Sequence, residues 1–211
     1  MIRRHALAAT IAAVLSLSAP AVSLAWESEV ADLTQRWERI TTERPEDQRR
    51  QALAHLAEEA AALVDENPGE AAPLVWLGII EASHARERRG LGALDSAKKA
   101  RAALEKAVKL DPQGGNGSAY VTLGALYDRA PGWPLGFGDA ETAEAMFQRA
   151  LAIRPQGIDV NFYYAAFLEE EGRREAAREH ARRAVAGEVR KGREASDAAL
   201  RERARELLSR L

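Results

Sequence analysis

The sequence predicts an all-α protein, an α-solenoid of three to four antiparallel helix pairs with a C-terminal capping helix. The main observation is that one stripe of small and apolar residues, closed by a proline, occurs twice at an offset of 43 residues. A partial third copy follows at an offset of 34 residues and lacks the proline. One helix cannot bury such a stripe alone, so repetition predicts stacking. The copies are Ala100, Leu104, Ala107, Val108, Leu110 and Pro112; Ala143, Phe147, Ala150, Leu151, Ile153 and Pro155; and Ala177, Ala181, Ala184 and Val185.

The first 25 residues have the pattern of a signal peptide. Arg3 and Arg4 form a basic start, residues 6–17 are apolar, and small residues precede a cleavage point after Ala25. An uncleaved membrane anchor is the alternative, but the apolar segment is shorter than the roughly 20 residues that a spanning helix needs. We therefore expect export to the periplasm or the medium, with no stable membrane insertion after cleavage.

Composition excludes several classes of function. The chain has no cysteine, which rules out disulfides, thiolate metal sites and thiol nucleophiles. Residues 26–172 carry 16 basic and 25 acidic side chains, whereas residues 173–211 carry 12 and 7. A basic C-terminal part could contact nucleic acid or an anionic membrane, but no aromatic residue lies among its arginines. The pattern favours solvated faces of amphipathic helices and no nucleic-acid partner.

The helices are expected in pairs along the chain. Residues 26–68 form an N-terminal capping pair, with helices over 26–42 and 46–66 that end at Pro45 and Pro68. Three repeats follow at 69–112, 113–155 and 156–190. Their expected helices span 71–88 and 96–110, 118–129 and 140–153, and 160–171 and 173–189.

Glycine and proline mark the connections between these helices. Residues 90–92 read as a connector, Ser118 as the N-cap of the helix that it starts, and Gly172 as a tight turn. Residues 131–139 hold two prolines and three glycines, so they form an irregular loop whose Asp139 caps the next helix. A capping helix is expected within 191–211.

These motifs resemble the tetratricopeptide repeat (TPR) family, whose first helix carries W-x2-L-G-x2-Y and whose second carries A-x3-F-x2-A before a proline. The matching residues are Tyr120, Leu123, Gly124 and Tyr127, followed by Ala143, Phe147, Ala150 and Pro155. The resemblance implies a helical scaffold that binds a protein or peptide partner without chemistry. We expect the small residues Gly78, Gly124 and Ala165 to face Ala100, Ala143 and Ala177, so that paired helices approach closely.

The 131–139 loop lengthens its repeat beyond the usual 34 or so residues. It resembles a loop, P-G-W-P-x-G-F-G-D, of a group of secreted bacterial TPR proteins. Some proteins of that kind are similar to the accessory T component of tripartite (TRAP) transport systems. That resemblance implies an alternative function, a small apolar ligand-binding accessory protein.

No enzyme motif is present, so we expect no catalytic residue, metal or cofactor. A glycine loop followed by lysine, as phosphate binding requires, is missing. His55, His84 and His180 stand alone, without a second histidine at helical spacing, so solvent-facing or capping roles are expected for them.

Two binding surfaces are candidates. One is the concave groove of the stacked first helices, which would suit an apolar or helical peptide. Its expected lining is mostly apolar with acidic edges, unless the C-terminal helix of the chain fills it: Val75, Ile79, Val121, Ala125, Asp128, Phe162, Ala166 and Glu169.

The other candidate is the 131–139 loop, through the aromatic rings of Trp133 and Phe137. The alternative is that both rings pack beneath the loop, against Tyr127 and Tyr163. The sequence thus predicts a non-enzymatic exported TPR scaffold and does not indicate its oligomeric state.

Overall fold

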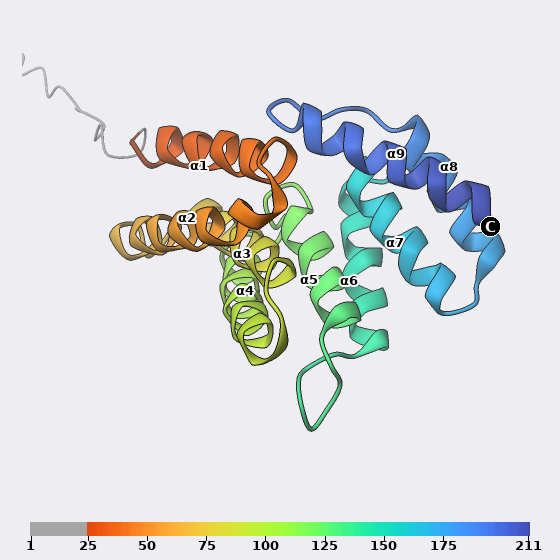
Figure 1. Cartoon of the computed structure of the whole chain (residues 1–211), viewed down its shortest axis with the longest axis horizontal. Coiled ribbons are helices and arrows are strands. Elements are labelled where there is room, and N and C mark those ends of the chain that lie inside the picture. Colours follow the sequence, from red (N-terminus) through yellow and green to blue (C-terminus); the bar gives the residue numbers. More distant parts are fainter. Residues whose placement is uncertain (1–24) are drawn as a thin grey trace, which may run out of the picture.

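The computed structural model describes residues 25–211, and all of the predicted signal peptide except Ala25 lies outside the described residues. The described part consists of nine α-helices without a β-strand, which confirms the all-α prediction (Figure 1). The helices are α1 (Ala25–Thr42), α2 (Glu46–Glu66), α3 (Ala71–Arg86), α4 (Gly90–Leu110), α5 (Ser118–Arg129), α6 (Ala140–Ile153), α7 (Ile158–Glu170), α8 (Arg174–Ala186) and α9 (Glu194–Arg210).

Consecutive helices form four pairs, α1–α2, α3–α4, α5–α6 and α7–α8, and α9 packs on the last pair. Each second helix also contacts the first helix of the next pair. This is the stacked arrangement that the repeated stripe predicts, because each hairpin buries an apolar face that it cannot bury alone. The predicted solenoid of helix pairs with a capping helix is therefore confirmed.

Within the middle pairs, a glycine lets the two helices approach. A Cβ atom added at Gly78 would lie 2.3 Å from Leu104 Cγ, and one added at Gly124 would lie 2.7 Å from Phe147 Cε1. The expectation that these glycines face Ala100 and Ala143 was therefore inexact, since their nearest neighbours are the large residues one helical turn later. The Leu104 and Phe147 side chains fit between the paired helices only because the residue that faces each of them is a glycine, which has no Cβ atom.

The start of α4 and the N-cap of α5 differ from the sequence-based expectation, and α7 begins two residues earlier than expected. Helix α4 begins at Gly90 and not at 96, so residues 90–92 are its first turn and not a connector. The reason is that the three residues 87–89 suffice for the turn, while Leu94 and Ala97 continue the inward-facing side of the helix. Helix α5 has Gly117, in a left-handed conformation, as its N-cap in place of Ser118. The predicted cap of α6 is present, because Asp139 accepts a hydrogen bond from the Thr142 amide at 2.7 Å.

The first helices of the four pairs form a closed ring together with the capping helix α9. Helices α1, α3, α5, α7 and α9 each contact the next, and α9 returns to contact α1 (Figure 1). At this junction the Ser196 amide donates to Glu38 Oε1 at 2.7 Å, and the Arg193 guanidinium lies 4.3 Å from the centroid of the Trp37 ring. The concave side of the solenoid is thus enclosed by the N-terminal and C-terminal helices of the same chain.

We predict that Gly124→Ala lowers the free energy of unfolding by about 1–3 kcal/mol, because the new methyl group overpacks against Phe147. Denaturant unfolding monitored by circular dichroism measures the change. Adding Phe147→Leu should restore part of the loss. Gly69→Ala is the matched control, since nothing lies within 4 Å of a Cβ atom there. Equal stability of the Gly124 and Gly69 variants would contradict this packing.

Candidate binding surfaces

The predicted groove residues do not share one open surface. Val75 and Ile79, on α3, line a pocket of about 470 Å³. Val121 is buried in a cluster with Ala150 and Val160, away from that pocket. Ala125 and Ala166 are half-buried.

Helix α9 covers the α7 end of the predicted groove. Phe162 is buried in a cluster with Leu200 and Ala204 of α9. The carboxylate of Glu169, expected at an acidic edge, accepts from Arg210 of α9 at 2.8 Å. Asp128, at the other expected acidic position, pairs with Arg129 at 2.8 Å. At the α7 end, the C-terminal helix of the chain therefore occupies the place of a partner.

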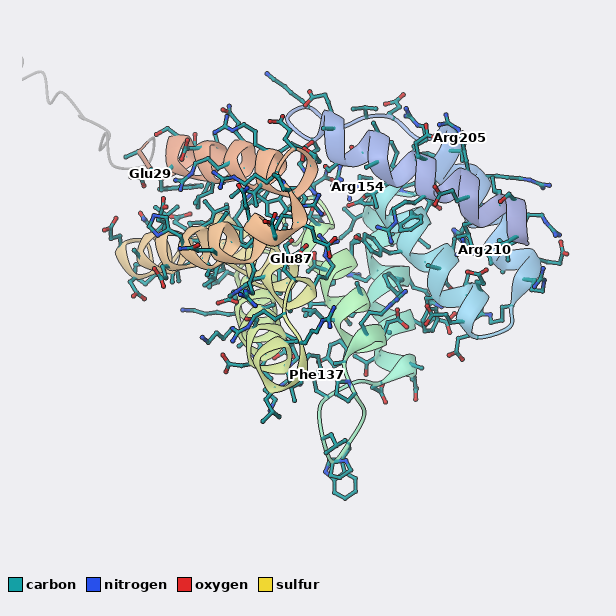
Figure 2. All side chains as sticks on the ribbon, in the orientation of Figure 1. Glu29, Glu87, Phe137, Arg154, Arg205 and Arg210 are labelled. Atoms are coloured by element: carbon teal, nitrogen blue, oxygen red, sulfur yellow. The ribbon has the colours of Figure 1, made fainter. Side chains whose placement is uncertain are left out.

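A pocket lies between α1, α3, the start of α5 and the α6–α7 and α8–α9 connections, and it has two chemically distinct sides. One side is apolar and belongs to α3. The other carries basic residues from the α6–α7 and α8–α9 connections, and the Arg154 label in Figure 2 lies between α1, α5 and α9. The lining residues are Thr34, Ala72, Val75, Trp76, Ile79, Gly115, Asn116, Ser118, Arg154, Arg190, Lys191 and Arg193. This lining contains four cationic residues and no acidic one, in contrast to the acidic edges that the sequence suggested.

A buried ionic network supports the basic side. Arg154 Nη2 donates to both carboxylate oxygens of Asp159, at 2.7 and 2.8 Å, and Arg190 Nη1 donates to the same carboxylate at 2.8 Å. Arg190 also donates to Asp197 through its backbone amide at 2.9 Å and through Nη2 at 2.5 Å. The network joins the end of α6, the start of α7 and the α8–α9 connection.

Burial and charge act in opposite directions on this network. Burial alone would raise the pKa of Asp159, but Arg190 and Arg154 outweigh it and hold this pKa below its ordinary value. Burial would likewise lower the pKa of Arg190, but its hydrogen bonds to Asp197 raise it. The Asp159 carboxylate and the Arg190 guanidinium are therefore both charged at neutral pH.

The α5–α6 loop, residues 130–139, is fixed to the body of the protein at its base. The Gly138 amide donates to Pro131 O at 2.9 Å, and the Asp139 amide donates to Tyr127 O at the same distance. The Phe137 side chain lies at the base of the loop (Figure 2). Its ring packs edge-on against Tyr127, with centroids 5.5 Å apart, and the Arg101 guanidinium lies 4.4 Å from the centroid of the Phe137 ring. A Cβ atom at Gly138 would lie only 1.9 Å from Ala130 O. The two ends of the loop can therefore approach this closely only because residue 138 is a glycine.

The tip of this loop presents apolar side chains to solvent. Trp133 is 90% exposed and Leu135 is 74% exposed, while the loop projects away from the helices (Figure 1). Phe137 therefore packs beneath the loop, as one reading of the sequence expected, and Trp133 does not. Phe137 anchors the base of the loop to Tyr127, whereas Trp133 lies on the surface.

The described residues contain neither a group of three metal-ligating side chains nor a helix long and apolar enough to cross a membrane. Of the three histidines, His84 was expected at the surface but is buried, with Nδ1 3.4 Å from Ser96 Oγ. His180 pairs with Asn161 Oδ1 at 2.9 Å and packs on Tyr164. Both have structural partners within their helix pair.

Comparison with known proteins supports the fold. No protein-family model matches the sequence, and no curated protein matches it. Among solved structures, the fold is similar to the crystal structure of a thermophilic TPR protein from Thermus thermophilus. The two share 20% sequence identity, with a TM-score of 0.57 over 89% of this chain and 95% of that one. The chain therefore has the fold of a TPR-type helical-repeat protein.

The basic side of the pocket was not predicted from the sequence. The sequence pattern placed the basic residues of 173–211, Arg190 and Arg193 among them, on solvated helix faces, and it gave Arg154 no role. One signal in the sequence could have indicated it. Arg190, Lys191 and Arg193 cluster around Gly192, outside any helix, so they cannot form the i,i+4 ion pairs of a helical surface. Asp159 and Asp197 were a second signal of a buried ionic network. Each lies in the first turn of a helix and is buried by packing, so each needs a positively charged partner.

We predict that Asp197→Asn lowers the free energy of unfolding by about 3 kcal/mol, because it leaves the buried Arg190 guanidinium without its full counter-charge. Urea unfolding of the mature protein measures this. Asp95→Asn is the control, since the Asp95 carboxylate is mostly exposed and pairs only with Lys99. A loss no larger than that of the control would show that the network does not stabilise the fold.

The network also predicts acid sensitivity. The pKa of Asp159 is lower in the folded chain than in the unfolded chain, so its contribution is complete above the unfolded pKa of about 4 and is lost as pH falls through the folded value. Unfolding free energies measured between pH 7 and pH 3 should therefore fall below about pH 4. Asp159→Asn should show a smaller slope in that acid range, and an unchanged slope would contradict the assignment.

Proposed function

We propose that this chain is a non-enzymatic, exported TPR-type scaffold that binds a protein partner, with the 130–139 loop as its docking element. The observation that carries the proposal is the exposure of Trp133 and Leu135 at the tip of a loop whose base is fixed by hydrogen bonds and by Phe137. The closed ring of first helices makes an extended peptide along the concave side a less suitable ligand than a partner that meets this loop.

The loop has the chemistry of an interface anchor. Residues 130–138 contain no charged side chain, so burying them against a partner desolvates no charge. Tryptophan is enriched among the residues that contribute most to protein–protein binding. A loop that is already ordered loses little conformational entropy on binding, which favours affinity.

Export is supported by the pattern of residues 1–25. We predict that the full-length chain, expressed in a Gram-negative host, is recovered from the periplasm with Trp26 as its first residue. Fractionation followed by N-terminal sequencing measures this. Recovery from the cytoplasm with the first 25 residues retained would contradict export.

The docking role is tested by placing a photo-crosslinking amino acid at Trp133 in the native host. We expect a discrete crosslinked protein that is absent when the same group replaces Leu91, a similarly exposed apolar residue on α4. The partner so identified should bind Trp133→Ala, Leu135→Ala protein at least tenfold more weakly, at unchanged thermal stability, because both side chains are solvent-exposed. Equal crosslinking at both positions, or unchanged affinity, would contradict the proposal.

A further inference from the structure

The pocket between α3 and the α8–α9 connection has more positive than negative charge. Four cationic residues line it, and the carboxylates that compensate them are Asp159, Asp197 and Glu38. Asp197 is fully buried behind Arg190, and Asp159 is 7% exposed at its side chain. The carboxylates therefore lie behind the guanidinium groups, and one positive charge in excess faces the cavity. The four cationic residues are Arg154, Arg190, Lys191 and Arg193.

Several donors on this side have no partner among residues 25–211. Arg190 is fully engaged by Asp159 and Asp197, but Arg154 Nε is buried without a hydrogen bond. Arg193 donates only through Nε, to Ser196 Oγ at 3.3 Å, and stands 3.6 Å from the Glu38 carboxylate. Its terminal nitrogens donate no hydrogen bond within residues 25–211, and the Lys191 ammonium makes no ion pair or hydrogen bond there.

The environment of Arg193 favours an added anion. Its guanidinium lies over Trp37 and within 5.4 Å of the centroid of the Trp76 ring. Burial, together with repulsion from Arg190, lowers the pKa of Arg193 to about 10. An anion in the pocket would offset both effects, because it adds an attractive charge in a region of low dielectric constant.

The opposite side of the pocket is apolar. Ala72, Val75, Trp76 and Ile79 come from one helix, α3, and present a continuous hydrocarbon and aromatic surface. The volume of about 470 Å³ lies in the range of small-molecule sites. The N-terminus of α5, at Ser118, opens on the same pocket and adds the positive end of a helix dipole.

We propose that this pocket binds a monoanion with an apolar body, a carboxylate held by Arg193 and Lys191 while the apolar part packs on Val75, Trp76 and Ile79. The excess of one positive charge selects a carboxylate over a doubly charged phosphate monoester. Such a carboxylate can come from a small organic acid or from the C-terminus of an apolar peptide. The site is separate from the Trp133 loop and does not depend on its role.

Calorimetric titration of the mature protein tests the class of ligand. Octanoate should bind at least tenfold more tightly than octanol, octylamine or octyl phosphate, because only it combines the apolar chain with a single negative charge. The tripeptide acetyl-Leu-Ala-Leu, with a free or an amidated C-terminus, distinguishes the sources: tighter binding of the free peptide than of octanoate assigns a peptide terminus, and weaker binding assigns a small acid. Octanol binding as tightly as octanoate, or octyl phosphate binding more tightly, would overturn the proposal.

Variants test the residues. Arg193→Gln and Lys191→Gln should each weaken octanoate binding about tenfold, whereas Arg182→Gln, at an exposed arginine of α8, should leave it unchanged. Lys191 is exposed, so Lys191→Gln should leave the fold intact. It therefore still tests the site if Arg193→Gln destabilises the protein. Equal affinity of the Lys191 and Arg182 variants would show that the pocket does not hold the anion.

Discussion

The buried carboxylates of Asp159 and Asp197 determine how the C-terminal third of the chain is placed. Each accepts hydrogen bonds from Arg190, which lies in the connection between α8 and α9. Burying these charges is costly unless they are paired, so the connection is held where its arginine reaches both carboxylates. From that point α9 runs back over α7 and its N-terminal end meets α1. This arrangement of charges, together with the packing of Phe162 against Leu200 and Ala204 of α9, holds the ring of helices closed.

Closure changes what a helical-repeat scaffold can bind. An open solenoid offers a long concave groove, which suits an extended or helical peptide. Here α9 buries Phe162, and contacts between α1 and the α9 end close the opposite side. The structure leaves open a pocket with an apolar wall and an arginine-rich wall, and a loop projects from the ring. The two proposed recognition surfaces are therefore an open pocket and an exposed apolar loop tip.

The architecture was predictable from the sequence because its signals are local and repeated. The recurring stripe gave the helix pairs, and Asp139 gave the start of α6, since capping depends on residues three apart. The start of α4 was missed because Gly90 and Gly92 suggest a loop, and only packing of the inward face of the helix offsets their poor helix propensity. Helix periodicity could show which residues of each helix are buried. It could not show that α9 would cover the inward side of α7.

The chemistry of the pocket was not predictable for a different reason. Arg154 and Arg190 are 36 residues apart and meet only through the shared carboxylate of Asp159. No periodic pattern records such a long-range pairing, so the basic residues were indistinguishable from a solvated face. The α5–α6 loop was only partly predictable from the sequence. Its irregular backbone was evident from prolines and glycines, but which ring packs inward depends on the tertiary position of Tyr127.

Closure of the ring is tested most directly by a distance measurement in solution. The chain has no cysteine, so spin labels attached at Arg39→Cys on α1 and Ala198→Cys on α9 report only on the junction between these helices. Double electron–electron resonance should give one narrow distribution centred at the separation that the closed ring places between these two exposed positions. A broad distribution, or a main population at much longer distance, would show an open solenoid and contradict the account.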